Sequence, residues 1–122
     1  MKFREIKLET GAGIILGKDE ESNEELVKKF RGKVNVILHT AKPGSPFCVI
    51  EKENPASSEI RAGGVITARY SQDWRNNKSD IKVNVFTGKD VYKLKGMPTG
   101  TFGVKKSRTI IVKKEEILKL KE

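Results

Sequence analysis

Apolar and polar residues alternate in several short runs along this 122-residue chain, and an alternation of period two predicts β-strands. Stretches rich in glycine, proline or asparagine separate these runs, as expected for the turns between strands. The predicted strands cover residues 2–8, 14–16, 34–40, 47–51, 81–86, 91–94, 101–104 and 109–112.

Two other segments have apolar residues at helical spacing. In the first, Asp19 can cap a helix, acidic residues follow in the first turn, and basic residues precede Gly32. This order of charges complements the helix dipole, and the glycine can close the last turn. The second segment runs from about residue 57 to Tyr70 and contains Gly63 and Gly64. Each mid-helix glycine costs about 1 kcal/mol relative to alanine, so we expect this helix to approach another element closely there.

The remaining segments complete a mixed fold. Residues 71–80 are polar and predict a loop, and residues 114–122 predict a short helix. The order β-β-α-β-β-α, followed by further strands, indicates an α+β fold with a mainly antiparallel sheet and two main helices. A chain of this length fits a single compact domain over residues 1–122. No apolar run is long enough to span a membrane or to act as a signal peptide, so we expect a cytoplasmic protein.

The net charge of +9 is unevenly distributed along the chain. From Arg75 to Lys114 there are eleven basic and two acidic residues, so the whole excess of positive charge lies in this C-terminal third. Such asymmetry indicates a polyanionic partner, and we expect these cations to gather on one exposed wall of the domain. A lysine-rich solvated surface is the alternative interpretation.

Nucleic acid is the polyanion that this composition favours. Lysine and arginine supply phosphate contacts that do not depend on base sequence, and a nearby aromatic ring can stack on an exposed base. A lone tryptophan also commonly fills a core, and this remains the alternative for Trp74. The predicted nucleic-acid contacts are Lys18, Trp74, Arg75, Lys78, Lys93, Lys95, Lys105, Lys106 and Arg108.

His39 and Cys48 are the only histidine and the only cysteine, and they flank the turn at residues 42–46. A catalytic triad needs a nucleophile and an acid beside the histidine, but Asn35, roughly 13 Å away along the strand, is an amide. We therefore expect no catalysis, no metal ion and no cofactor. His39 either fastens the turn by hydrogen bonds or contacts a ligand.

Residues 11–18 look like a phosphate-binding loop but do not match its spacing. The motif needs four residues between its glycines and a serine or threonine after its lysine. Here five residues separate Gly11 from Gly17, and Asp19 follows Lys18. We predict a hairpin turn at these glycines rather than a nucleotide site.

Several short motifs, taken in order, resemble the NFACT-R domain, a family of RNA-binding domains. The resemblance runs from about Ile14 to Val112, and the chain is similar to the small, nearly stand-alone members. The motifs are Gly17-Lys18-Asp19, the run from Asn23 to Lys28, the run from Val34 to His39, Pro43-Gly44-Ser45, Asn54-Pro55, Tyr70-Ser71 with Trp74 close behind, and the run from Pro98 to Phe102.

The resemblance implies binding to RNA, with ribosomal or transfer RNA and the large ribosomal subunit as partners and a role in translation or ribosome quality control. We expect no membrane partner and no small-molecule substrate. The chain departs from the family at Asn35, where an aspartate is usual, and at Ile37, where an aromatic residue is common. The motif residues with expected structural roles are Gly17, Asn23, Asn35, His39, Gly44, Ser45, Tyr70, Ser71, Pro98 and Gly100.

Two questions about these residues stay open at this point. Asn23, His39 and Ser45 either shape the binding face as a polar cluster or only hold the first helix against the turn. The lysines could also dock the domain on an acidic protein, which makes a protein-interaction module the alternative function.

Overall fold

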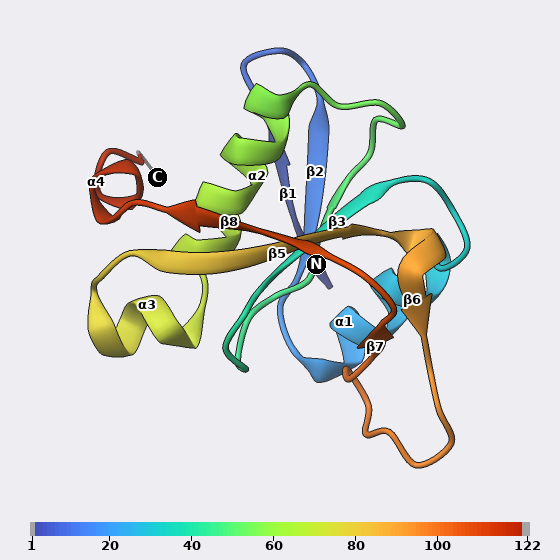
Figure 1. Cartoon of the computed structure of the whole chain (residues 1–122). Helices are drawn as coiled ribbons and strands as arrows, with labels where there is room; N and C mark the ends of the chain where they lie inside the picture. The colour runs from blue at the N-terminus through green and yellow to red at the C-terminus, as the bar shows by residue number, and fades with distance from the viewer. Residues whose placement is uncertain (1, 121–122) are drawn as a thin grey trace.

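A six-stranded antiparallel sheet forms the centre of the domain in a computed structural model that describes residues 2–120 (Figure 1). Its strand order is β1-β2-β4-β3-β5-β8, so β1 and β8 are the edges. The strands are β1 Phe3–Lys7, β2 Gly13–Gly17, β3 Val36–Thr40, β4 Cys48–Ile50, β5 Ile81–Thr87 and β8 Arg108–Val112. A separate two-stranded hairpin joins β6 Val91–Tyr92 to β7 Gly103–Val104.

The long helix α2, Ser57–Arg69, covers one face of the sheet. Leu38, Ile50 and Val83 are completely buried in the core between this helix and the sheet. A Cβ atom on Gly64 would lie 2.8 Å from the Cδ1 atom of Ile110, so the helix and the sheet approach closely at this point. This confirms the expectation from the two mid-helix glycines.

The helix α1, Glu20–Phe30, covers part of the opposite face. It starts where the sequence predicts, because the carboxylate of Asp19 accepts a hydrogen bond from the backbone N of Ser22 at 2.8 Å. Its apolar side packs on Ile37 and Phe86, which pair across β3 and β5. Figure 1 shows α1 lying beside the β6–β7 hairpin.

Beyond α1 the same face carries a row of polar side chains. His39 pairs with Asn84, and Asn84 pairs with Thr109 on β8. His39 lies two residues along β3 from Ile37, and residues two apart on a strand point to the same face. These three polar residues therefore continue the face that α1 covers, outside the area under the helix.

The structure confirms the α+β class, the antiparallel sheet and the two main helices, and corrects one loop. Residues 71–80 contain the short helix α3, Gln72–Asn77, for which the hydroxyl of Ser71 accepts a hydrogen bond from the backbone N of Trp74 at 3.2 Å. The helix is short, so no helical period is visible in the sequence, although Ser71 is a typical N-cap residue.

Two other corrections concern the ends of elements. The strands predicted at 91–94 and 101–104 are each only two residues long, because residues 93–102 form a loop between β6 and β7. The C-terminal helix α4 covers Lys114–Leu118, and residues 121–122 of the predicted helix lie outside the described part of the chain. No helix within residues 2–120 is long and apolar enough to cross a membrane.

Candidate nucleic-acid interface

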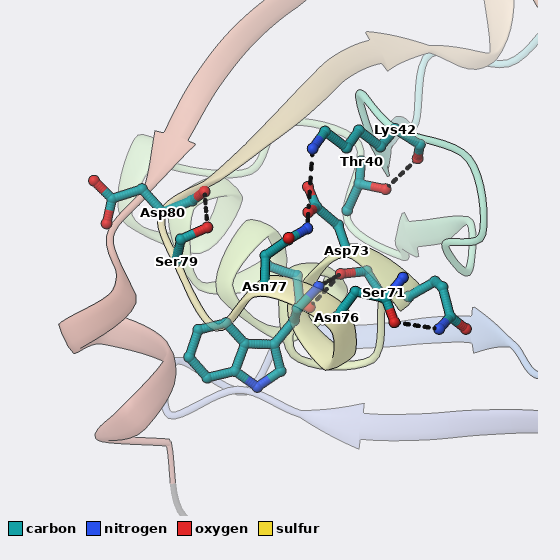
Figure 2. Close-up of polar contacts among 11 residues, drawn as sticks. Thr40, Lys42, Ser71, Asp73, Asn76, Asn77, Ser79 and Asp80 are labelled. Atoms are coloured by element: carbon teal, nitrogen blue, oxygen red, sulfur yellow. Dashed lines mark hydrogen bonds and ion pairs between the residues drawn. The ribbon is translucent and has the colours of Figure 1, made fainter.

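Internal hydrogen bonds fix the turn between β3 and β4. The hydroxyl of Ser45 accepts a hydrogen bond from the backbone N of Thr40 at 3.2 Å and donates one to the carbonyl of Pro46 at 2.8 Å. The hydroxyl of Thr40 donates to the carbonyl of Lys42 at 2.7 Å, as Figure 2 shows. Gly44 has a φ of +86°, a conformation that a glycine adopts without strain.

His39 holds the same turn from inside the sheet. Its Nδ1 lies 2.8 Å from the carbonyl oxygen of Thr40, and its ring packs against Phe47 with centroids 4.4 Å apart. Burial lowers the pKa of His39, and hydrogen bonds to the backbone of Thr40 and Ser45 oppose this shift only in part. The neutral imidazole therefore fastens the turn, which is one of the two roles expected for it, and it also lines the hollow described below.

Asn23 ties helix α1 to the turn. Its Oδ1 accepts a hydrogen bond from the backbone N of Phe47 at 3.0 Å, so the amide on the apolar side of the helix has a partner. A Cβ atom on Gly17 would lie 2.0 Å from this Oδ1, so any other residue at position 17 would force the Asn23 side chain to move. Asn23, His39 and Ser45 thus surround one turn, and all three line one hollow.

Helix α3 supports the turn from the other side. The backbone N of Gln72 donates to the carbonyl of Gly44 at 2.8 Å, and Lys42 forms an ion pair with Asp73 at 3.7 Å. Asp73 also accepts a hydrogen bond from the side-chain amide of Asn77 at 2.7 Å (Figure 2). The Pro-Gly-Ser turn is therefore held by β3, α1 and α3 together.

Other motif residues also have structural contacts. The buried side-chain amide of Asn35 donates to the carbonyl of Ile50 at 3.1 Å, a bond that an aspartate could not donate. Ser71 is buried, and its hydroxyl donates to the carbonyl of Ala68 at 2.7 Å. The ring of Tyr70 lies 4.0 Å from the guanidinium of Arg4. Asn35, Ser71 and Tyr70 therefore all make contacts that stabilise the fold.

The loop between β6 and β7 is organised around Lys93. Its ammonium group contacts a carboxylate oxygen of Glu24 at 2.9 Å and the carbonyls of Pro98 and Thr101 at 2.7 Å each. Burial raises the pKa of Glu24, but hydrogen bonds from the backbone N of Gly100 and from Lys93 outweigh it and hold the pKa below its usual value. Lys93 uses all three of its hydrogens inside the protein, which leaves none for the predicted phosphate contact.

A hollow of about 590 Å³ lies beside the Pro-Gly-Ser turn. His39, Asn84 and Phe86 of the sheet form one side of it, and the loop residues Thr101 and Phe102 line it as well. Two smaller hollows, of about 280 Å³ and about 340 Å³, each share lining residues with it at a different place, and we call these two places its ends. The 280 Å³ hollow shares Glu20, Asn23, Gly44 and Ser45 with it, and the 340 Å³ hollow shares Phe86 and Ser107. We call these three adjoining hollows the groove.

Cations lie at both ends of the groove. Lys18 and Arg75, both predicted contacts, line the 280 Å³ hollow together with Arg4. Lys106 and Arg108 line the 340 Å³ hollow. Lys105 directly precedes Lys106 in the loop between β7 and β8 and is exposed. Arg4 was not predicted, because it lies far in sequence from the basic third and only the fold of β1 beside β2 brings it to this hollow.

The other predicted contacts lie elsewhere. Lys95 is exposed in the loop between β6 and β7. Lys78 ends helix α3, and its ammonium lies 5.0 Å from the centre of the Trp74 ring. Trp74 is only 3% exposed and packs in the core on the α2 side of the sheet. The prediction that Trp74 stacks on a base is therefore wrong, and the core alternative is correct.

The cations of the C-terminal third do not form one wall. Lys113 and Lys114 follow the last residue of β8, whereas Arg108 is its first residue. A strand of this length separates its ends by roughly 16 Å. Lys113 also pairs with Asp80 at 3.6 Å. The expectation of a single basic wall is corrected to two clusters of cations at the ends of the groove, one of which includes residues from the N-terminal part of the chain.

The groove contains no activated nucleophile among the described residues. Burial raises the pKa of the Cys48 thiol to about 12, which keeps it protonated. The hydroxyl of Ser45 donates to a backbone carbonyl, and His39 contacts a carbonyl where a triad histidine contacts a carboxylate. No three metal-ligating side chains gather within residues 2–120. The arrangement is suited to binding through hydrogen bonds, rings and cations.

Comparisons with known proteins agree with this chemistry. The family model of the NFACT protein RNA binding domain matches residues 2–106. No curated protein sequence matches the chain. Among solved structures, the C-terminal of the fibronectin/fibrinogen-binding protein from Streptococcus suis matches with a TM-score of 0.84 at 20% identity. The match covers 100% of this chain and 50% of that one, and at this identity it shows the fold alone.

Proposed function

The chain belongs to the NFACT family of RNA-binding domains, and from this premise we propose that it binds ribosomal or transfer RNA along the groove. The proposed setting is the cytoplasm, in translation or ribosome quality control, with the large ribosomal subunit as a candidate partner. This setting is supported by the resemblance to domains that commonly occur in large ribosome quality-control factors.

The observation that carries the proposal is the pair of cation clusters at the ends of the groove. Arg4, Lys18 and Arg75 lie at one end. Lys106 and Arg108 lie at the other, beside Lys105. Cations spaced along a groove follow a phosphate backbone, and they release condensed counterions from it, which supplies affinity for any base sequence.

The rigid turn in the middle of the groove favours binding further. Ser45 and Gly44 are held by hydrogen bonds from Thr40 and Gln72, so the surface between the two clusters does not have to become ordered on binding. A preorganised surface keeps more of its contact energy as affinity. The hydrogen bonds that hold the Pro-Gly-Ser turn in place can therefore also preorganise it for binding RNA.

Crosslinking in cells, followed by sequencing of the attached RNA, tests this function. We expect fragments of ribosomal or transfer RNA to be enriched over messenger RNA. A parallel purification with and without ribonuclease separates the proposal from docking on an acidic protein, because only a link through RNA is lost on digestion. Partners that stay bound after complete digestion, with no enrichment of either RNA class, would overturn it.

A further inference from the structure

The central hollow of the groove differs in chemistry from its two ends. None of its lining residues is a lysine or an arginine, and one of them, Glu20, is acidic. Aromatic side chains and neutral polar groups make up much of the rest. Acidic residues line the two ends as well, Asp19 and Glu20 at one and Asp90 at the other, but each end also has at least two cations. A phosphate placed in the central hollow would have no neutralising cation among the lining residues. The hollow is therefore matched to an uncharged group, whereas the two ends are matched to phosphates.

Asn84 gives this hollow a hydrogen-bond donor of fixed orientation. The hydroxyl of Thr109 donates to the Oδ1 of Asn84 at 2.9 Å, which sets the direction of the amide. Among residues 2–120 the amide nitrogen of Asn84 has no hydrogen-bond partner, so both of its hydrogens remain available. Asparagine amides in this situation pair with the edges of bases, which carry acceptors and donors in one plane.

The side chain of Phe102, which is partly exposed at the hollow, can contact the ring of a base. Phe102 meets Phe47 edge to face, with centroids 5.9 Å apart, and the ammonium of Lys93 lies 4.5 Å from the centre of the Phe102 ring. These contacts hold Phe102 in place at the hollow. Aromatic surface next to polar groups that bond base edges is the common design of pockets for unpaired bases.

We propose that the groove binds single-stranded RNA and that one unpaired base enters the central hollow, where its edge bonds to the amide of Asn84. This inference rests on the proposed RNA binding. The phosphates on the two sides of that base then lie toward Arg4 and Arg75 at one end and toward Lys106 and Arg108 at the other. A base in a duplex is stacked and paired and cannot enter, so paired RNA makes only the phosphate contacts.

The test uses a seven-nucleotide RNA strand, its duplex with the complementary strand, and seven versions in which one base at a time is removed. Affinity for the intact chain is measured by fluorescence anisotropy. We expect the duplex to bind more weakly than the single strand. Removal of one particular base should weaken binding roughly 5- to 100-fold, as for the loss of a stacked base, while the other removals have smaller effects.

Variants assign the sensitive base to the hollow. Asn84→Ala should weaken binding of the complete strand but should not weaken further the strand that lacks the sensitive base. Asn54→Ala is the matched control, because Asn54 is exposed in the loop between β4 and α2, at the other end of β4 from the Pro-Gly-Ser turn. Thr109→Val is a second variant that keeps the amide of Asn84 but removes the bond that orients it, and it should give a smaller loss.

The outcomes separate this inference from the proposed function. RNA that binds equally well as a duplex, or with any single base removed, would overturn the base pocket and leave RNA binding intact. Equal effects of Asn84→Ala and Asn54→Ala would also overturn it. An absence of binding to every strand would overturn both the pocket and the proposed function. Thermal unfolding of each variant establishes that it is folded before its affinity is interpreted.

Discussion

The two faces of the central sheet differ in how completely they are covered. On the face of α2, the strand residues Leu38 and Val83 have no exposed surface. On the other face, α1 stops short of the β5–β8 edge, where Ile111 is 47% exposed and Thr109 is exposed. The covered face supplies the apolar burial that stabilises the fold, and the open face keeps Asn84 and its neighbours accessible for binding. Substitutions on the α2 face should therefore lower the free energy of unfolding, and substitutions on the open face should lower the RNA affinity.

The largest effect should come from the covered face. Replacing Leu38 with alanine removes a fully buried side chain beneath α2 and should lower the free energy of unfolding by about 2–5 kcal/mol. Urea unfolding followed by circular dichroism measures this change. Asn84→Ala on the open face of the neighbouring strand is the comparison and should cost much less. Equal losses of stability for the two variants would contradict the division between the faces.

A substitution at Gly17, where α1 meets the Pro-Gly-Ser turn, should lower both the free energy of unfolding and the RNA affinity. Gly17→Ala would place a methyl group 2.0 Å from the Oδ1 of Asn23, which must move and lose its bond to the backbone N of Phe47. We expect a loss of about 1–3 kcal/mol in the free energy of unfolding, from overpacking and from the broken hydrogen bond. RNA affinity should fall as well, because the Pro-Gly-Ser turn loses one support. Normal affinity in the folded variant would show that the position of the turn does not matter for binding.

Charge reversal at one end of the groove should affect binding and not stability. Changing Lys105, Lys106 and Arg108 together to glutamate should weaken RNA binding by about tenfold or more and reduce its dependence on salt. For the unchanged protein, three to five phosphate contacts give a slope of log affinity against log salt of roughly −2 to −4 on single strands. A flat slope for the unchanged protein would refute the phosphate contacts.

The matched control for this reversal places the same change of charge away from the groove. Lys7, Lys114 and Lys119 are exposed, and Lys7 and Lys119 lie at a hollow between β1 and α4. Changing these three lysines to glutamate alters the net charge by the same amount and should leave most of the affinity in place. If the two triple variants bind RNA equally weakly, net charge explains the binding and the groove does not.

The smallest effect concerns pH and comes from His39. Burial holds the pKa of folded His39 below its unfolded value of about 6.5, so the unfolded chain takes up a proton more readily. Stability should therefore fall as the pH is lowered from 6.5 toward the folded pKa, and His39→Gln should remove this dependence. Thermal unfolding between pH 5 and 7.5 measures it.

Glu59 changes the stability in a lower pH range, so its effect can be separated from that of His39. Hydrogen bonds from Thr10 and from the backbone of Ala56, together with Lys52, lower the pKa of Glu59 to about 2. Its contribution to stability is present above about pH 4.5 and is lost as the pH falls from there toward 2.

An unchanged melting temperature between pH 7.5 and 5 in the unmodified protein would contradict the role of His39.

The sequence was sufficient to predict features that depend on local signals. The cap at Asp19 and the acidic first turn define α1 without any tertiary contact. Alternation of apolar and polar residues predicts strands such as β5, and short continuous apolar runs between turn residues predict β2 and β4. Gly63 and Gly64 indicated a close approach, although the sheet residues that they meet could not be named from the sequence.

Features that depend on distant partners were not predictable. Lys93 is an internal contact because Glu24, 69 residues earlier, lies beside it. Trp74 is buried because α3 folds where a loop was expected. The role of Asn84 depends on the register of β5 with β3 and β8, and no local pattern marks it. The cations at one end of the groove likewise come from distant parts of the chain, because Arg4 and Lys18 lie there beside Arg75.

Mapping the contact surface directly tests the central claim, which is that RNA lies in the groove beside the Pro-Gly-Ser turn. The intact chain is crosslinked to a short photoreactive RNA, and the modified peptides are identified by mass spectrometry. We predict crosslinks in the segments that contain Phe102 and residues 105–108, with none in α2 or α4. Crosslinks concentrated on α2 and α4, with the groove unmodified, would contradict the account.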